Sequence, residues 1–157
     1  MAGTTDYTGR SIDLLIFQGV EESGSQQVSM AFGDTGYICT GIQKLAQKWT
    51  ILFLADVGSK KYWQTEGTDI LNAIRNSNIR TSQELIGHFN DAAFSVAETL
   101  TGDPDYTALE DDERLSRADL VNYVLDREGG YLYLKVNLVS VSGNSREIKL
   151  PIPVVIK

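Results

Sequence analysis

Two segments late in the chain alternate apolar and polar residues, which is the pattern of a β-strand with one buried face. The segments are YLYLKVNLVSV at 131–141 and REIKLPIPVVIK at 146–157. Residues 142–145 between them read SGNS, a composition typical of a hairpin turn. This pattern constrains the fold strongly, because a register slip of one residue would turn every buried side chain outward.

A Gly-Gly pair at 129–130 marks an earlier turn, and the segment before it is ambiguous. In ADLVNYVLDR (118–127), the valines and Leu125 are spaced as a helix would also have them. We interpret this segment as a strand, because a Gly-Gly turn into a strand favours a meander. The sequence therefore predicts a C-terminal three-stranded antiparallel meander over about 117–156.

Pro151 and Pro153 both fall on the polar face of the last strand. Proline has no N–H for a ladder, so we expect this strand at the edge of the sheet. The opposite face is continuously apolar and comprises Leu150, Ile152, Val154 and Ile156. A bare apolar edge favours pairing with a strand of another protein. Alternatively, the prolines and Lys157 protect the edge, and the residues alone leave both possibilities open.

The middle of the chain has the periodicity of helices. Thr40 with Gln43 has the form of a capping box before an apolar stripe, so we expect a helix over about 41–55 that stops near Gly58. Thr68 or Asp69 is expected to cap a second, short helix.

A third helix is expected to begin after Thr81, which forms a capping box with Glu84, and to run to about residue 100. Residues 1–10 have the composition of a flexible end. Residues 11–20 (SIDLLIFQGV) are expected to form a strand, with 28–32 as its partner.

These elements predict one α+β domain over 11–157. Two to three helices, within about 41–100, are expected to pack on the C-terminal meander, with an N-terminal strand added to it.

Composition excludes several classes of function. The chain has 157 residues and a formal net charge of −7, which argues against a general binder of nucleic-acid phosphates, although a local basic patch stays open. Cys39 and His88 are single, so we expect no disulfide and no thiolate-rich zinc site. No segment reaches the roughly 20 apolar residues of a membrane span, and the N-terminus does not resemble a signal peptide.

Two loops contain groups capable of chemistry. An acidic connector that could bind a hard cation contains Asp103, Asp105, Asp111 and Asp112. Their spacing is not that of a calcium loop, and the alternative is a solvated loop. The loop at 60–63 (KKYW) could contact nucleic acid. As a connector between helices, its aromatics would instead cover the core and its lysines would be solvated.

The segment TGIQKLAQKWTILFLADVGSKKYWQTEGTDIL (40–71) resembles the core of the baseplate wedge proteins of contractile-tailed phages, also called sheath initiators. The shared features are a helix with a Q-K stretch, a tight Gly-Ser turn, a short loop and a Gly-Thr pair opening the next helix. The closing SGNSREIKLPIPV (142–154) also resembles the last hairpin of that family. The resemblance spans about residues 38–156.

DDERLSRADL (111–120) falls where this family carries a Glu-Pro-Arg-hydrophobic motif before its final strands. Asp112, Glu113, Arg114 and Leu115 occupy the four motif positions. The proline is therefore absent, and the glutamate is an aspartate.

The resemblance implies a small α+β domain with a C-terminal sheet like that of the sheath subunit. It also implies a structural virion protein of the tail baseplate, made in the host cytoplasm, without catalytic residues, cofactor or metal. The implied partners are the tail sheath protein and other baseplate wedge proteins, with the tail tube as a further one, in a six-fold assembly. No direct contact with nucleic acid or membrane is expected.

On this reading, residues 146–157, with 11–18 as a second candidate, pair with strands of other chains. The partner-binding residues expected are Trp63, Asp112, Arg114, Leu150, Ile152, Val154 and Ile156.

Three other functions fit the same residues. A tail-completion or tube-end protein of the virion would offer similar strands. A small metal-dependent enzyme would use Asp103, Asp105 and Asp112. A monomeric binding module would receive a peptide strand at its sheet edge.

Overall fold

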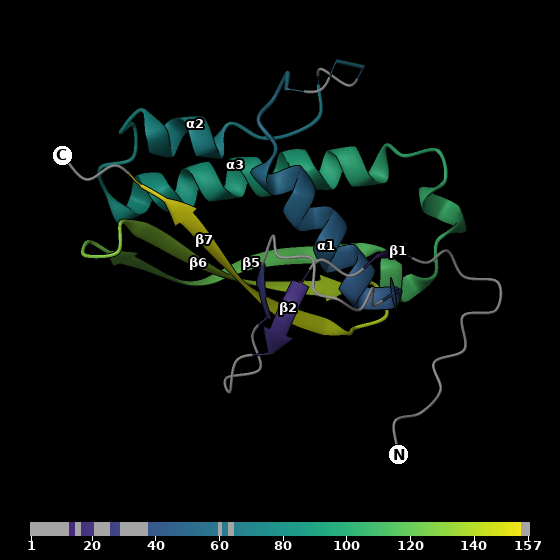
Figure 1. Ribbon diagram of the computed structural model, residues 1–157. Coiled ribbons are helices and arrows are strands. Elements are labelled where there is room, and N and C mark those ends of the chain that lie inside the picture. The colour runs from purple at the N-terminus through teal and green to yellow at the C-terminus, as the bar shows by residue number, and fades with distance from the viewer. Residues whose placement is uncertain are drawn as a thin grey trace.

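The computed structural model describes residues 13–14, 17–20, 26–28, 38–59, 61–62 and 65–154. Within these residues the chain forms two layers, with three α-helices on one face of a twisted sheet (Figure 1). The expected flexible end at 1–10 and most of the expected strand at 28–32 lie outside the described residues.

The helices and strands follow one another along the chain in the order β–α–β. Four short N-terminal strands come first, then the helices, then three long strands. Their bounds are β1 Asp13–Leu14, β2 Phe17–Val20, β3 Gln26–Val28, β4 Ile38–Cys39, α1 Gly41–Leu54, α2 Ile70–Arg75, α3 Ser82–Thr101, η1 Tyr106–Ala108, η2 Asp111–Glu113, β5 Leu115–Asp126, β6 Tyr131–Ser140 and β7 Ser145–Pro153.

The C-terminal sheet confirms the predicted α+β class and the antiparallel meander. β5 pairs with β6, and β6 pairs with β7, both in antiparallel register. The ambiguous segment at 118–127 is a strand, because its core-facing residues pair with the buried residues of β6. The larger sheet has the order β2-β3-β7-β6-β5, and β1 pairs separately with β4.

The expected edge position of the last strand is wrong over part of its length. β3 pairs with β7 in parallel, with Gln26 opposite Ile148 and Gln27 opposite Lys149. β7 therefore lies inside the sheet at 148–149. From residue 150 onward, β6 is its only described neighbour, and the two prolines fall in that part.

The core lies between the helices and the sheet. Trp49 and Phe53 of α1 stack with ring centroids 4.6 Å apart, and Phe89 of α3 lies 5.5 Å from Phe53. The even-numbered residues of β6 and β7 cover the same space from below, as the period-two pattern predicts: Leu132, Leu134, Val136, Leu138, Ile148, Leu150 and Ile152 are all buried.

The two expected capping boxes have different outcomes. Thr81 Oγ1 accepts the Glu84 N–H at 3.2 Å, and the Glu84 carboxylate accepts the Thr81 N–H at 3.1 Å, so this box is confirmed. Hydrogen bonds from the Arg80 and Thr81 N–H groups hold the pKa of Glu84 below its usual value. The box expected at Thr40 is wrong, because that side chain does not cap α1.

Candidate interaction site

The apolar face of β7 belongs to the protein's own core. Leu150 and Ile152 are 0% and 2% exposed. Val154 is half-buried against the same core, and Ile156 lies outside the described residues. The side chains of Leu150 and Ile152 are therefore not available to a partner. They can contribute to binding only by fixing the register of the β7 backbone.

The two prolines define the free flank of β7. The Val154 N–H donates to Gly130 O at 2.9 Å, on the side of β6. Because the backbone N–H and C=O groups of successive residues point to opposite sides of a strand, the carbonyls of Pro151 and Pro153 point away from β6. There the strand offers carbonyl acceptors at both prolines and no N–H donor from either.

A buried carboxylate closes the N-terminus of α1. Glu113 of η2 is 6% exposed, and its Oε1 accepts hydrogen bonds from Thr40 Oγ1 at 3.1 Å and the Gly41 N–H at 3.2 Å. Its Oε2 lies 3.5 Å from Lys44 Nζ. The sequence placed Glu113 at the proline position of the family motif but did not predict this contact, because 103–116 has the composition of a solvated connector and the contact spans 72 positions.

Arg114 and Asp112 flank this carboxylate. The Arg114 guanidinium forms an ion pair with Asp111, three residues earlier. The backbone carbonyl of Arg114 accepts the Val141 N–H at 2.9 Å. Arg114 Nε is buried without a hydrogen-bond partner among the described residues. Asp112 is half-buried. Arg114 thus has a carboxylate partner within its own chain, and pairing with another protein stays a prediction.

The expected partner-binding residues do not form one cluster. The segment of Asp112 and Arg114 adjoins the β6–β7 turn, where the Ser142 N–H donates to Asp111 O at 3.1 Å. Pro153 lies opposite Tyr131 at the other end of β6, about 30 Å away at ~3.3 Å per residue. Trp63 lies outside the described residues.

The loop between α1 and α2 is closed at its base. Thr68 Oγ1 donates to Phe53 O at 2.6 Å, and the Thr68 N–H donates to Ala55 O at 2.8 Å. Thr68 therefore caps the C-terminus of α1, which ends before Gly58, and α2 begins after Asp69 without a side-chain cap. At the tip, Tyr62 is 79% exposed, so this aromatic does not cover the core as expected.

Asp103 in the acidic connector is held by its own chain. Its Oδ1 accepts the Asp105 N–H at 3.0 Å, and its Oδ2 lies 3.1 Å from Lys48 Nζ. The Asp105 N–H and the Lys48 ammonium lower the pKa of Asp103. Among the described residues no group of three or more acidic, histidine or cysteine side chains is placed to hold a metal ion. His88 lies in α3, within the helix expected after Thr81.

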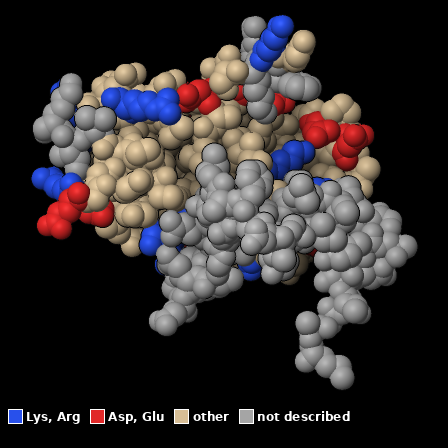
Figure 2. Space-filling view, viewed as in Figure 1, with Lys and Arg blue, Asp and Glu red and all other residues tan. Residues whose placement is uncertain are grey.

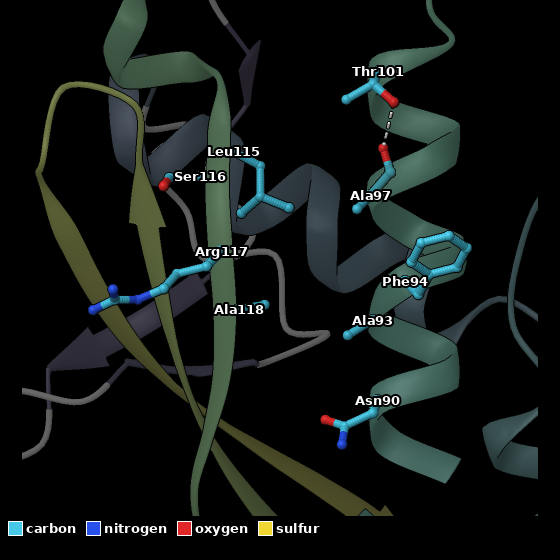
Figure 3. Close-up of a pocket in the computed structure, with 9 residues that line it drawn as sticks. All are labelled: Asn90, Ala93, Phe94, Ala97, Thr101, Leu115, Ser116, Arg117 and Ala118. Atoms are coloured by element: carbon cyan, nitrogen blue, oxygen red, sulfur yellow. Dashed lines mark hydrogen bonds between the residues drawn. The ribbon is translucent and has the colours of Figure 1, made fainter. Parts of the chain in front are cut away.

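The exposed flank of β5 is a second candidate, which sequence patterning did not single out. β5 pairs only with β6 among the described strands. A hollow of about 350 Å³ separates its beginning from α3, where Leu115 and Ala118 face Ala93 and Ala97 (Figure 3). Phe94, on the rim of this hollow, is 65% exposed.

Charged side chains lie mostly around the rim of the face shown in Figure 2, and much of the described surface between them is uncharged. None of the described helices has the length and apolar character needed to cross a membrane.

Comparisons of the chain with protein-family models, with curated proteins and with solved structures find no match.

Proposed function

We propose that this protein is a structural component of a contractile-tail baseplate, of the wedge or sheath-initiator kind. It joins other wedge proteins and nucleates sheath assembly by β-strand addition. The resemblance at about 38–156 supports this proposal, together with an α+β fold that ends in a long antiparallel meander.

The observation that carries the proposal is the flank of β7 beyond residue 149. Its side chains at 150 and 152 are locked in the core, and its other flank has no described strand neighbour. A strand added there would meet a backbone of fixed register. Because both prolines lack an N–H, the added strand has to supply N–H donors to their carbonyls, which disfavours self-pairing of this flank.

The partners that follow are the sheath protein, other wedge proteins and the tail tube. A ladder of main-chain hydrogen bonds gives a mechanically continuous link. Six copies around a tube bind a ring of partners with avidity, so each single contact can be weak.

The direct test is truncation after Val154, in cells whose own copy of the gene is removed. The truncated chain retains every described residue of β7, so we expect normal folding. It lacks the last three residues of the 146–157 segment expected to pair in trans, so we expect baseplates without sheath in electron micrographs. The matched control replaces 155–157 by an equally long Gly-Ser-Gly segment, which should behave as the truncation does if an apolar strand is needed. Normal sheathed tails from the truncated chain would refute the role of this segment.

A further inference from the structure

β5 is a long edge strand with an unusual number of exposed apolar side chains. Val121, Val124 and Leu125 are 54%, 54% and 47% exposed. Soluble proteins usually protect such an edge with charges, prolines or bulges. β5 has a bulge between Leu120 and Asn122, but residues 122–126 beyond it pair regularly with β6.

The backbone in this regular stretch has a donor directed away from β6. The Tyr123 N–H donates to the Asn122 side-chain oxygen at 2.9 Å, and not to a neighbouring strand. The Asn122 carboxamide thus occupies the place that the carbonyl of an added strand would take. Because alternate residues address the same side, the Leu125 N–H is directed the same way.

A hollow of about 420 Å³ lies beside this stretch, between the end of β5 and the start of α3. Its apolar lining includes Ile79, Leu85, Tyr123 and Leu125. Among the described residues, the charged ones that line it are Arg80 and Arg127, although the chain has 21 acidic and 14 basic residues. Among the described residues neither guanidinium forms a salt bridge or a side-chain hydrogen bond, and the acidic neighbour of Arg80 is Glu84, whose carboxylate is hydrogen-bonded to the N–H groups of Arg80 and Thr81.

We propose that the 122–126 edge of β5 and this hollow bind an extended segment of another protein that is apolar and acidic. The segment adds to the sheet beside Tyr123 and Leu125, places an apolar side chain in the hollow, and directs a carboxylate to Arg80 and Arg127. Five paired residues span about 17 Å at ~3.3 Å each, so a short linear segment suffices. This inference rests on the proposed role in assembly and assigns it a second, receiving surface.

The test starts from a displayed library of random peptides of about ten residues, selected against the full-length protein. We expect enriched peptides with alternating apolar residues and at least one Asp or Glu. The double variant Arg80→Gln with Arg127→Gln should bind such a peptide about tenfold or more weakly in fluorescence anisotropy, because charge-assisted hydrogen bonds are lost. The matched control is Arg117→Gln, since Arg117 lies on β5 but points away from α3 (Figure 3) and should leave the affinity unchanged.

Hydrogen exchange gives the readout of strand addition. Bound peptide should slow exchange of the Tyr123 amide about tenfold or more. The inference is overturned if no peptide is enriched, if the enriched peptides lack acidic residues, if the double variant binds equally well, or if Tyr123 stays unprotected. A concentration-dependent dimer that is lost in the double variant would assign the surface to a second copy, which also overturns it. Because the selection uses no virus particle, failure of the selection leaves the baseplate proposal standing. Absence of the protein from tails would remove the assembly role assigned to this surface without changing the measured peptide binding.

Discussion

Glu113 supplies what the first turn of α1 lacks. That turn has no acidic residue and no side-chain cap of its own. Instead, the Glu113 carboxylate accepts hydrogen bonds from the Thr40 hydroxyl and the Gly41 N–H. A buried carboxylate is stable only when paired and hydrogen-bonded, and Lys44 completes the pairing. One side chain thus ties the segment before β5 to the start of the first helix.

Glu113→Ala should lower the free energy of unfolding by about 3 kcal/mol, because it removes a buried carboxylate together with its hydrogen bonds from Thr40 and Gly41 and its ion pair with Lys44. Denaturant unfolding measures this loss. Glu110→Ala is the control, since Glu110 is exposed, and it should change stability by less than about 0.5 kcal/mol. Equal effects of the two variants would contradict the capping role.

Asp103 should make part of the stability dependent on acid. In the folded protein the pKa of Asp103 lies below its ordinary value of 3.8. The stabilisation by the ionised carboxylate is therefore fully present above pH 3.8 and is lost as the pH falls through the folded pKa. Asp103→Asn should therefore be less stable than the natural protein near pH 7, by at most about 1 kcal/mol for an exposed pair.

The difference between Asp103→Asn and the natural protein should vanish as the pH falls through the folded pKa of Asp103, which lies below 3.8. Denaturant unfolding as a function of pH tests this. Asp105→Asn serves as the control, because the Asp105 carboxylate has no hydrogen-bond partner in the described part of the chain. A difference that persists in acid would show that Asp103 acts through packing and not through its charge.

At the scale of elements, features set by neighbouring residues were predicted correctly, whereas features set by contacts distant in sequence were not. The capping box of Thr81 and Glu84 lies within four residues and is present as predicted. The start of α1 depends on a residue 72 positions away, and the position of β7 depends on β3, more than 100 positions away. No periodic pattern encodes such pairs, so neither the contact of Glu113 nor the inner position of β7 was predictable.

The α1–α2 connection contains a glycine that no other residue can replace without strain. Gly67 has a φ of +109°, and a Cβ there would lie 2.5 Å from Ala55 O. Gly67→Ala should therefore cost more than about 2 kcal/mol of stability, since the backbone at the base of the loop has to move.

Gly58→Ala in the same connection is the matched variant. Gly58 also has positive φ, +79°, but a Cβ there would meet no atom within 4 Å. Its cost should be about 1 kcal/mol, from the left-handed backbone alone. If thermal melts give the two variants the same loss, the close approach of Ala55 to Gly67 is not what fixes the loop.

The last strand has a core function that is separable from assembly. Ile152→Ala should destabilise the protein by about 3 kcal/mol, because it leaves a cavity where a buried side chain packed against the core. Val121→Ala, at an exposed position of β5, should change stability by less than about 0.5 kcal/mol. A small effect of Ile152→Ala in urea unfolding would contradict the placement of β7 in the core. Deleting 151–157, which removes Ile152, would therefore mix loss of folding with loss of assembly.

At the scale of the whole molecule, the fold class was predictable and the binding surfaces only partly. The alternating strands and helical stripes specify an α+β protein with a C-terminal meander, since each pattern is local. The seven expected binding residues instead divide between a buried face, two ends of the sheet and positions outside the described residues. The β5 flank was not expected, because local patterns show neither which strand lies at the edge of the sheet nor which face of it the helices leave uncovered.

The central claim is that the protein belongs to a contractile-tail baseplate. Immunogold electron microscopy on intact tailed particles from the same source tests it most directly, with an antibody shown to bind the native protein. The proposal predicts label confined to the baseplate end, at the bottom of the sheath. Label at the head end would identify a tail-completion protein instead, and particles without label would contradict a structural role in the tail.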